Sequence, residues 1–382
     1  MAGRCYAAAV PRLALIGPSH PFRGGIARTT TALAAALAAR GNLAGFFTPR
    51  RQYPAWLYPG GADVDPRACP RLDATDPCYG VLEPWTWPGL RRRVAAAAPE
   101  ALVAPYWTWA WAPLVRALTS WQRPVVAVVH NPADHDAGPL ERRAARAALG
   151  RCRGFLCHAR SVAAALDDAY PGRPVAVHPL PADPLALPAR DVARRRLGVP
   201  ADATAFLAFG LLRPYKGTDV LLEAFARLDS GRRAVLLLAG EPWGTVAADI
   251  GRRLADPRLA GRVIVALRWI PEEEAPVWFA AADVAVLPYR AATGSAVAAQ
   301  ALGAGLPVIA SRVGGLAEVI ADDVNGVLVS PADVAALTGA LERLLDSGVR
   351  CRLAAGAARA AAHASWDTYA RALDELARTV LA

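Results

Sequence analysis

The sequence predicts an α/β protein built from two doubly wound, Rossmann-like domains that face a central cleft. Short apolar strands alternate with helical patterns along most of the chain, which is typical of parallel sheets covered by helices on both faces. A proline-dense segment, 179–188, separates two such sets. The predicted domains are therefore 1–183 and 184–364. The final stretch, 365–382, is an amphipathic helical pattern that could pack on either half.

The composition favours a cytoplasmic protein whose partners are anionic. The chain has 382 residues, is 54% hydrophobic and carries a net charge of +10, which favours phosphates, nucleotides or an acidic membrane surface. The arginines are spread along the chain and no nucleic-acid module is recognisable, so no nucleic-acid partner is expected. No apolar run reaches the roughly 18 residues of a membrane span, and Pro11 interrupts the N-terminal apolar run, so no signal peptide is expected. A predicted helix at 141–149 has a basic face, usually a solvated feature, which leaves open peripheral contact with the inner membrane face.

The six cysteines follow no zinc-binding spacing. One local cluster, Cys152, Cys157 and His158, brings sulfur and imidazole together. We expect buried, reduced thiols of a cytosolic protein rather than a metal site.

The first domain is predicted to begin with a strand at 13–16, a loop that contains Gly24 and Gly25, and a helix from Ile26 to about Arg40. A glycine pair between a strand and a helix lets the backbone approach a ligand and present free N–H groups, although a plain glycine turn is the alternative. Residues 50–90 are expected to be irregular, and the remaining strands of this domain are predicted at 44–47, 101–106, 124–129, 154–159 and 174–179.

The strand at 124–129 ends in a polar cluster of His130, Asp134, His135 and Asp136. Ligands bind α/β folds at the carboxyl ends of strands, and imidazole and carboxylate groups serve there in catalysis. The cluster therefore predicts active-site residues, with a loop of capping side chains as the alternative.

Tryptophans gather in the first half, where seven of the 11 precede residue 122. Trp107 and Trp109 directly follow a predicted strand. Indole rings stack on sugar C–H edges and also favour membrane interfaces, while core packing is the plainer interpretation. We expect one or two of them, with Asp134 and His135, to contact the acceptor of a reaction.

The second domain opens on the most informative stretch, 206–217, with sequence FLAFGLLRPYKG. A buried strand leads into a loop with Arg213 and Lys216, and Gly217 then opens a helix. Two cations at a strand end beside a helix N-terminus predict a phosphate or diphosphate site. Lys216 is the one lysine among the 43 lysine and arginine residues of the chain. Because arginine serves at every other basic position, we expect that this position requires a compact ammonium group.

A second anion site is predicted after the strand at 283–288. Thr293 can cap a helix that starts at Gly294, and the amides of Gly294, Ser295 and Ala296 would then point at a ligand. Gln300, further along this helix, could reach a ribose hydroxyl, or it could be a satisfied interfacial amide.

These motifs resemble those of GT-B glycosyltransferases in the large retaining family, glycosyltransferase family 4, and the resemblance covers essentially the whole chain. Its strongest part is LGAGLPVIASRVGGLAEVI at 302–320 with VNGVLVSP at 324–331. The resemblance implies that Arg213 and Lys216 stabilise a leaving diphosphate. It also implies that backbone groups around Arg268 and Ile270 seat the nucleobase, and that residues 365–382 cross back onto the first domain.

The same resemblance implies that Gly24 and Gly25 close over the donor and that His130 positions its sugar. Most members carry two glutamates, with seven residues between them, at the donor helix. This chain has Ala292 and Gln300 at those positions. Gln300 still offers a hydrogen bond without the charge of a carboxylate, whereas Ala292 offers none.

The expected activity is therefore transfer of a sugar from a UDP- or GDP-sugar to a small-molecule or lipid-linked acceptor, with retention of configuration. No metal or other cofactor is expected, because the two cations take the place of a metal at the leaving phosphate. Two alternatives stay open: a non-catalytic scaffold that binds a nucleotide sugar, and a hydrolase or epimerase of the same fold.

Overall fold

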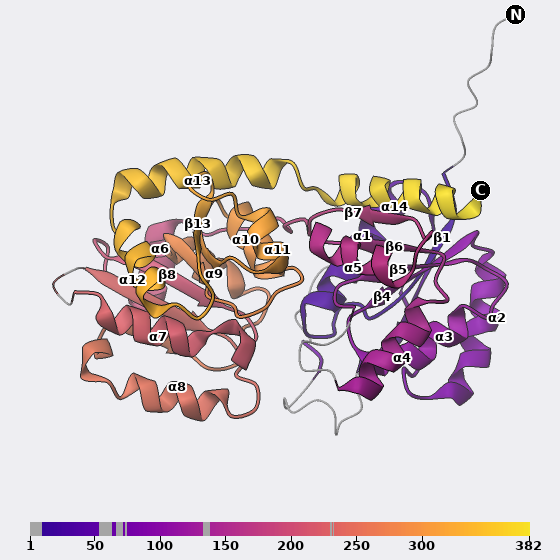
Figure 1. Cartoon of the computed structure of the whole chain (residues 1–382), viewed down its shortest axis with the longest axis horizontal. Coiled ribbons are helices and arrows are strands. Elements are labelled where there is room, and N and C mark those ends of the chain that lie inside the picture. Colours follow the sequence, from indigo (N-terminus) through magenta and orange to yellow (C-terminus); the bar gives the residue numbers. More distant parts are fainter. Residues whose placement is uncertain are drawn as a thin grey trace, which may run out of the picture.

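The computed structural model describes residues 10–52, 63–65, 72, 75–132, 138–229, 231 and 233–382. These residues form two parallel sheets side by side, each covered by helices (Figure 1). One sheet has seven strands in the order β3-β2-β1-β4-β5-β6-β7, and the other has six in the order β10-β9-β8-β11-β12-β13. The fold class predicted from the sequence is confirmed.

The strands are short, and the described strands pair with their neighbours in parallel. In the first sheet they are β1 Leu13–Ile16, β2 Leu43–Pro49, β3 Thr75–Tyr79, β4 Ala101–Tyr106, β5 Val125–Val129, β6 Gly154–Cys157 and β7 Val175–Val177. In the second sheet they are β8 Thr204–Phe209, β9 Ala234–Ala239, β10 Val263–Ala266, β11 Val284–Leu287, β12 Val308–Ser311 and β13 Gly326–Val329. The strand β3 lies in the stretch expected to be irregular, which corrects that prediction: Asp76 and Pro77 hide its apolar pattern.

The helices connect successive strands and cover both faces of each sheet. Those of the first half are α1 Gly25–Ala39, α2 Trp87–Ala97, α3 Ala112–Leu118, α4 Pro139–Leu149 and α5 Arg160–Ala169. The later ones are α6 Arg190–Leu197, α7 Thr218–Arg227, α8 Val246–Leu254, α9 Ala275–Ala281, α10 Ala296–Gly303, α11 Gly314–Val319, α12 Val334–Arg343, α13 Ser347–Ala362 and α14 Trp366–Leu381. Alternate residues of one strand enter different cores: Leu102 packs under α2 and α3, and Val103 packs against α1 and α14.

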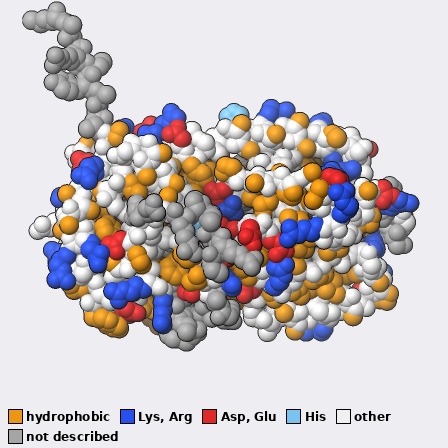
Figure 2. All heavy atoms as spheres, turned by 180° about the vertical axis from the view of Figure 1, so that it is seen from behind, with side chains coloured by type: hydrophobic (Ala, Val, Ile, Leu, Met, Phe, Trp, Pro, Cys, Tyr) orange, Lys and Arg blue, Asp and Glu red, His pale blue; other side chains and the backbone are white. Residues whose placement is uncertain are grey.

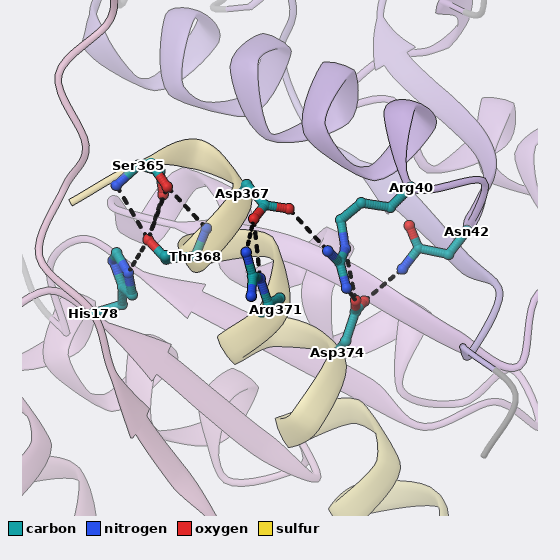
Figure 3. A network of polar contacts seen from close by, with 8 residues as sticks. All are labelled: Arg40, Asn42, His178, Ser365, Asp367, Thr368, Arg371 and Asp374. Atoms are coloured by element: carbon teal, nitrogen blue, oxygen red, sulfur yellow. Dashed lines mark hydrogen bonds and ion pairs between the residues drawn. The ribbon is translucent and has the colours of Figure 1, made fainter. Parts of the chain in front are cut away.

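The chain returns to the first half at its end. Helix α13 lies over the second sheet, and α14 packs on α1, β6 and β7 of the first (Figure 1). The carboxylate of Asp374, 1% exposed, accepts hydrogen bonds from Arg40 Nη2 at 2.9 Å and Asn42 Nδ2 at 2.5 Å (Figure 3). Ser365 begins α14 by accepting a hydrogen bond from Thr368 N at 3.1 Å. These contacts hold α14 against the first sheet.

The two halves meet along their carboxyl strand ends, where side chains of both charges gather (Figure 2). Glu318 of α11 accepts hydrogen bonds from Arg160 N at 2.6 Å and Ser161 N at 2.9 Å, which are free amides at the start of α5. His20 lies 3.0 Å from Glu272, and Trp269 donates to Asp65 at 3.2 Å. The halves are therefore joined by specific polar contacts as well as by the linker.

Candidate active site

The loop after β8 is held in one conformation by its neighbours. Gly217 has φ 66°, and a Cβ there would lie 2.1 Å from the carbonyl oxygen of Pro288, so only glycine fits. Arg290 donates to the carbonyl of Pro214 at 2.8 Å and forms an ion pair with Asp219 at 2.6 Å. The loop that carries the two predicted cations is thus tied to the end of β11.

Lys216 is the last residue of the short helix Pro214–Lys216 within this loop. Its Nζ is 5.3 Å from the ring centroid of Tyr289 and would lie 3.6 Å from a Cβ on Gly210. Among the described residues no carboxylate lies within 4 Å of it. Burial lowers the pKa of Lys216, with Arg213 adding to the effect and Tyr215 opposing it. Lys216 is half-buried, and its ammonium is a partly desolvated cation with no carboxylate partner in the part of the chain that the structure describes.

Arg213 lies on the same loop, with its guanidinium stacked 4.5 Å from the ring centroid of Trp243. Its buried Nε has no hydrogen-bond partner among the residues that the structure describes. A cation held by ring stacking keeps its N–H groups for another acceptor. Arg213 and Lys216 together are suited to bind an anion such as a diphosphate.

The start of α10 differs from its prediction. The helix begins at Ala296 rather than Gly294, and its cap is Ser295, which accepts a hydrogen bond from Ala298 N at 3.2 Å. Thr293 instead hydrogen-bonds Asn131, which follows β5 in the other half. The prediction of Thr293 as the cap is therefore wrong, because a contact across the cleft takes its hydroxyl.

The glycine pair of the first half faces this helix end. A Cβ on Gly25 would lie 4.0 Å from Cβ of Ala296, and Gly24 has φ 112°. Gly294 faces the other side of the cleft, where its Cβ would lie 3.5 Å from Cβ of His158. A small cavity here is lined by His158, Leu180, Gly294, Ser295, Ala298, Ala299, Gly315, Leu316 and Val319.

Gln300 is an interfacial amide, which is the alternative that the sequence left open. It is 6% exposed, and in the amide orientation that satisfies both ends its oxygen accepts from Arg28 Nη2 at 2.7 Å. Arg28 is also paired with Asp183, in the linker. The prediction that Gln300 reaches a ribose hydroxyl is corrected for this structure, because Arg28 and the linker occupy its side chain.

The predicted nucleobase loop has its own internal pairing. Arg268 forms a bidentate ion pair with Glu274, at 2.7 and 2.9 Å, and Ile270 is 6% exposed in the core of the second half. The Arg268 side chain is thus engaged within the loop. Arg23 of the glycine loop stacks 5.3 Å from the centroid of Trp269, so the two loops meet across the cleft.

His130 is the first residue after β5 and is 8% exposed. Its Nδ1 lies 3.2 Å from Nε2 of His158, the first residue after β6. In the sequence His158 is grouped with Cys152 and Cys157, although its position at the end of a predicted strand also indicates the cleft. Cys152 and Cys157 are free and buried, and no cluster of metal-ligating side chains occurs within the described ranges.

The predicted acceptor residues are only partly placed. Trp107 is 7% exposed and belongs to the core beside Trp111, which corrects its assignment to an acceptor cleft, and Trp109 is half-buried in the short helix Trp109–Trp111. Asp134 and His135, with Asp136, lie outside the described residues. None of the described helices is long and apolar enough to cross a bilayer.

Two family models match the chain: Glycosyltransferase Family 4 at residues 23–184 and Glycosyl transferases group 1 at residues 203–347. A D-inositol 3-phosphate glycosyltransferase 1 from Catenulispora acidiphila is 37% identical over 212 residues, 53% of this chain and 51% of that protein. A D-inositol 3-phosphate glycosyltransferase from Xylanimonas cellulosilytica is 37% identical over 196 residues, 51% and 46% of the two chains. The chain thus spans about half the length of the curated relatives it matches.

Solved structures resemble the chain over nearly its whole length. Sucrose-phosphate synthase from Thermosynechococcus elongatus gives a TM-score of 0.78 at 22% identity, covering 96% of this chain and 98% of that one. Anabaena HepE in complex with UDP-glucose gives 0.75 at 18% identity, with the same coverage of 96% and 98%. At these identities the likeness concerns the fold alone. With one family domain matched in each half, the chain belongs to glycosyltransferase family 4 and has the GT-B fold.

Proposed function

We propose that this chain transfers a sugar from a nucleotide diphosphate-sugar to an acceptor hydroxyl, with retention of configuration and without a metal ion. The observation that carries the proposal is the loop after β8, where Lys216 and Arg213 lack a carboxylate partner among the described residues. A cation pair of this kind stabilises charge that develops on a leaving phosphate.

In the proposed reaction the bond between the anomeric carbon and the diphosphate oxygen breaks, and the acceptor oxygen bonds to that carbon from the same face. The acceptor proton passes to the leaving phosphate oxygen. Lys216 and Arg213 neutralise the negative charge that grows on the diphosphate in the transition state. Retention by this front-face route is consistent with family membership, and the cations supply the electrostatic role that a metal would otherwise fill.

The donor is proposed to lie between the glycine loop and the start of α10. The two segments approach closely there, since a Cβ on Gly25 would lie 4.0 Å from Cβ of Ala296, and the small side chains leave the backbone N–H groups accessible. The solved neighbour HepE binds UDP-glucose, which favours a UDP-sugar. The relatives named D-inositol 3-phosphate glycosyltransferases make a small hydroxylated acceptor the first candidate to test.

Contact with an anionic membrane surface is a further part of the proposal, relevant to a lipid-linked acceptor. Helix α4 presents Leu140, 82% exposed, together with the exposed Arg143 and Arg146. Such a pairing of an apolar side chain with arginines suits binding at a headgroup interface. The proposed place of action is the cytoplasmic face of a membrane or the cytoplasm itself.

The test is a thermal-shift panel of UDP, GDP, ADP and dTDP on the wild type and Lys216→Ala. A nucleotide at about 100 times its dissociation constant adds roughly 2.7 kcal/mol to the free energy of unfolding. We expect one nucleotide to stabilise the wild type and to stabilise the variant much less. Stabilisation by none of the four would contradict the proposed donor site.

A non-catalytic scaffold is the second candidate, favoured by Ala292 where the family pattern has a glutamate. Nucleotide release from UDP-glucose, followed with and without D-inositol 3-phosphate, separates the candidates. Release that requires the acceptor supports the transferase, release without it supports a hydrolase, and binding without release supports the scaffold.

A further inference from the structure

Three neighbouring strands of the first sheet each end in a histidine. His130, His158 and His178 are the residues directly after β5, β6 and β7. The preceding residues are in register, since Val129 pairs with Cys157 and Cys157 pairs with Val177. The three histidines therefore form a row along the carboxyl edge of the sheet, which runs from the cleft toward α14.

The contacts within this row determine which ring nitrogens carry protons. Nδ1 of His158 lies 3.3 Å from the carbonyl oxygen of His178. A carbonyl oxygen only accepts hydrogen bonds, so Nδ1 of His158 must be the N–H donor. Burial lowers the pKa of His158 to about 4, so the ring is neutral near pH 7 and its Nε2 carries a lone pair.

The tautomer of His158 then determines the tautomer of His130. Nε2 of His158 lies 3.2 Å from Nδ1 of His130, and because the former can only accept, the latter must donate. Burial, with a contribution from His158, lowers the pKa of His130 well below its ordinary value, so this ring is also neutral. Nε2 of His130 is left as a lone-pair acceptor.

Helix α14 fixes the far end of the row. The Nε2 atom of His178 lies 3.0 Å from Thr368 Oγ1 (Figure 3). Its Nδ1 lies 2.7 Å from the carbonyl oxygen of Pro179. The ring of Tyr369 stacks on His158 with centroids 5.9 Å apart. Helix α14 thus holds the ring of His178, the residue whose carbonyl orients His158.

The near end of the row is incomplete. Nε2 of His130 is buried and has no hydrogen-bond partner in the part of the chain that the structure describes. A buried acceptor without a donor is unfavourable, and a ligand hydroxyl would satisfy it. A carboxylate at the same place would be unfavourable, because its oxygen lone pairs would face the lone pair of His130 Nε2 with no proton between them.

We propose that His158 is a positioning residue that holds His130 as a hydrogen-bond acceptor, so that a ligand group bound beside Nε2 of His130 must offer a proton, as a sugar hydroxyl does. The tautomer follows from the contacts alone, whereas the substrate class rests on the proposed function. The enzyme should accept neutral sugars with a hydroxyl at that position and discriminate against those with a carboxylate there.

The first experiment is long-range ¹H–¹⁵N spectroscopy of the ligand-free chain labelled with ¹⁵N in its six histidines. We expect His130 and His158 to be neutral at pH 7, each with a proton on Nδ1 and none on Nε2. A proton on Nε2 of His130 in the wild type would overturn the proposal.

Variants separate positioning from mere packing. In His158→Gln the amide oxygen can still accept from Nδ1 of His130, so the tautomer should persist, whereas in His158→Leu the proton should redistribute to Nε2. His363→Gln, at an exposed histidine that ends α13, is the matched control and should change neither signal. An unchanged His130 tautomer in a folded His158→Leu would refute the role of His158.

The substrate class is tested by calorimetry with UDP-glucose and UDP-glucuronate. We expect the wild type to bind UDP-glucose at least about tenfold more tightly, and His130→Ala to lose most of that preference. Equal affinities in the wild type would overturn the inferred substrate class. Failure of both sugars to bind would count against the proposed UDP-sugar function, while the spectra would still decide the tautomer.

Discussion

Replacing Lys216 by methionine should stabilise the ligand-free chain while it impairs function. The ammonium is partly desolvated, lies 5.3 Å from the Tyr289 ring and has no carboxylate within 4 Å among the described residues. Methionine fills similar space without a charge to bury. We expect Lys216→Met to raise the free energy of unfolding by about 0.5–2 kcal/mol, the usual gain when a function-bearing but unfavourable residue is removed.

The turnover number of Lys216→Met should fall, although its stability rises. Loss of one donor to a developing oxyanion costs about 10²–10³ in kcat, or roughly 2.7–4 kcal/mol. Acceptor-dependent nucleotide release should therefore fall at least about 100-fold in Lys216→Met, and stabilisation by UDP should shrink. Lys216→Arg should also lose activity, because the site that encloses Nζ suits a compact ammonium better than a planar fork.

The pH dependence gives a second, independent check. The pKa of Lys216 is lowered in the folded state below its ordinary 10.5, so between the two values the unfolded chain binds more protons. Near neutral pH the charge on Lys216 therefore lowers the free energy of unfolding by its full amount. This effect disappears as the pH rises from the lowered pKa of the folded state to the ordinary value of 10.5. The stability difference between Lys216→Met and the wild type should shrink accordingly.

Thermal unfolding with and without UDP measures these effects, and Arg227→Met is the matched control. Arg227 is an exposed cation on α7 with a Glu223 partner, so its loss should change stability by no more than about 0.5 kcal/mol. A Lys216→Met chain that is less stable than the wild type, yet responds fully to UDP and retains turnover, would refute the assignment of Lys216 to the diphosphate.

Other contacts lead to further predictions. Arg194→Met should lower the free energy of unfolding in urea by less than the about 3–5 kcal/mol of a fully unpaired buried charge, because Asp283 loses its partner at 2.6 Å but keeps its ion pair with Arg190 and its hydrogen bond from Ala205 N. The double variant Arg194→Met/Asp283→Leu should recover part of that loss. Glu318→Gln should weaken the contact between α11 and the free amides of α5 by about 1 kcal/mol, measured as faster amide exchange at the start of α5. Leu140→Asp with Arg143→Glu should reduce binding to vesicles that contain phosphatidylglycerol, and unchanged binding would exclude α4 as the contact surface.

Local patterns were sufficient to predict the two parallel sheets, because short apolar strands of three to seven residues between helices leave few other arrangements. Long-range contacts decided the details. Thr293 is a good cap by type, but Asn131 from the other half takes its hydroxyl and Ser295 caps the helix. Gln300 is likewise bound by Arg28, a partner that no local pattern indicates.

The histidine row could have been predicted from the sequence. Each of the three predicted strands 124–129, 154–159 and 174–179 contains or meets a histidine at its carboxyl end, and parallel strands bring those ends together. The tautomers could not, since they depend on the carbonyl of His178 and on the ring orientation that α14 maintains.

If the proposed function holds, the absence of both family glutamates should give His130 a larger share of sugar recognition. The carbonyl of Ala292 accepts a hydrogen bond from Gly315 N at 3.2 Å, so backbone contacts rather than a carboxylate maintain the loop before α10. With Ala292 apolar and Gln300 bound to Arg28, Nε2 of His130 is an unused buried acceptor beside the donor helix, as far as the described residues extend. A neutral acceptor binds a hydroxyl less strongly than a carboxylate does, because its hydrogen bond has no charge to assist it. We therefore infer weaker selection among neutral sugars than the family pattern would give. Ala292→Glu should sharpen that selection, measured as the ratio of affinities for two neutral UDP-sugars, but it should also lower the free energy of unfolding, because Ala292 is 9% exposed and packs in the core of the second half.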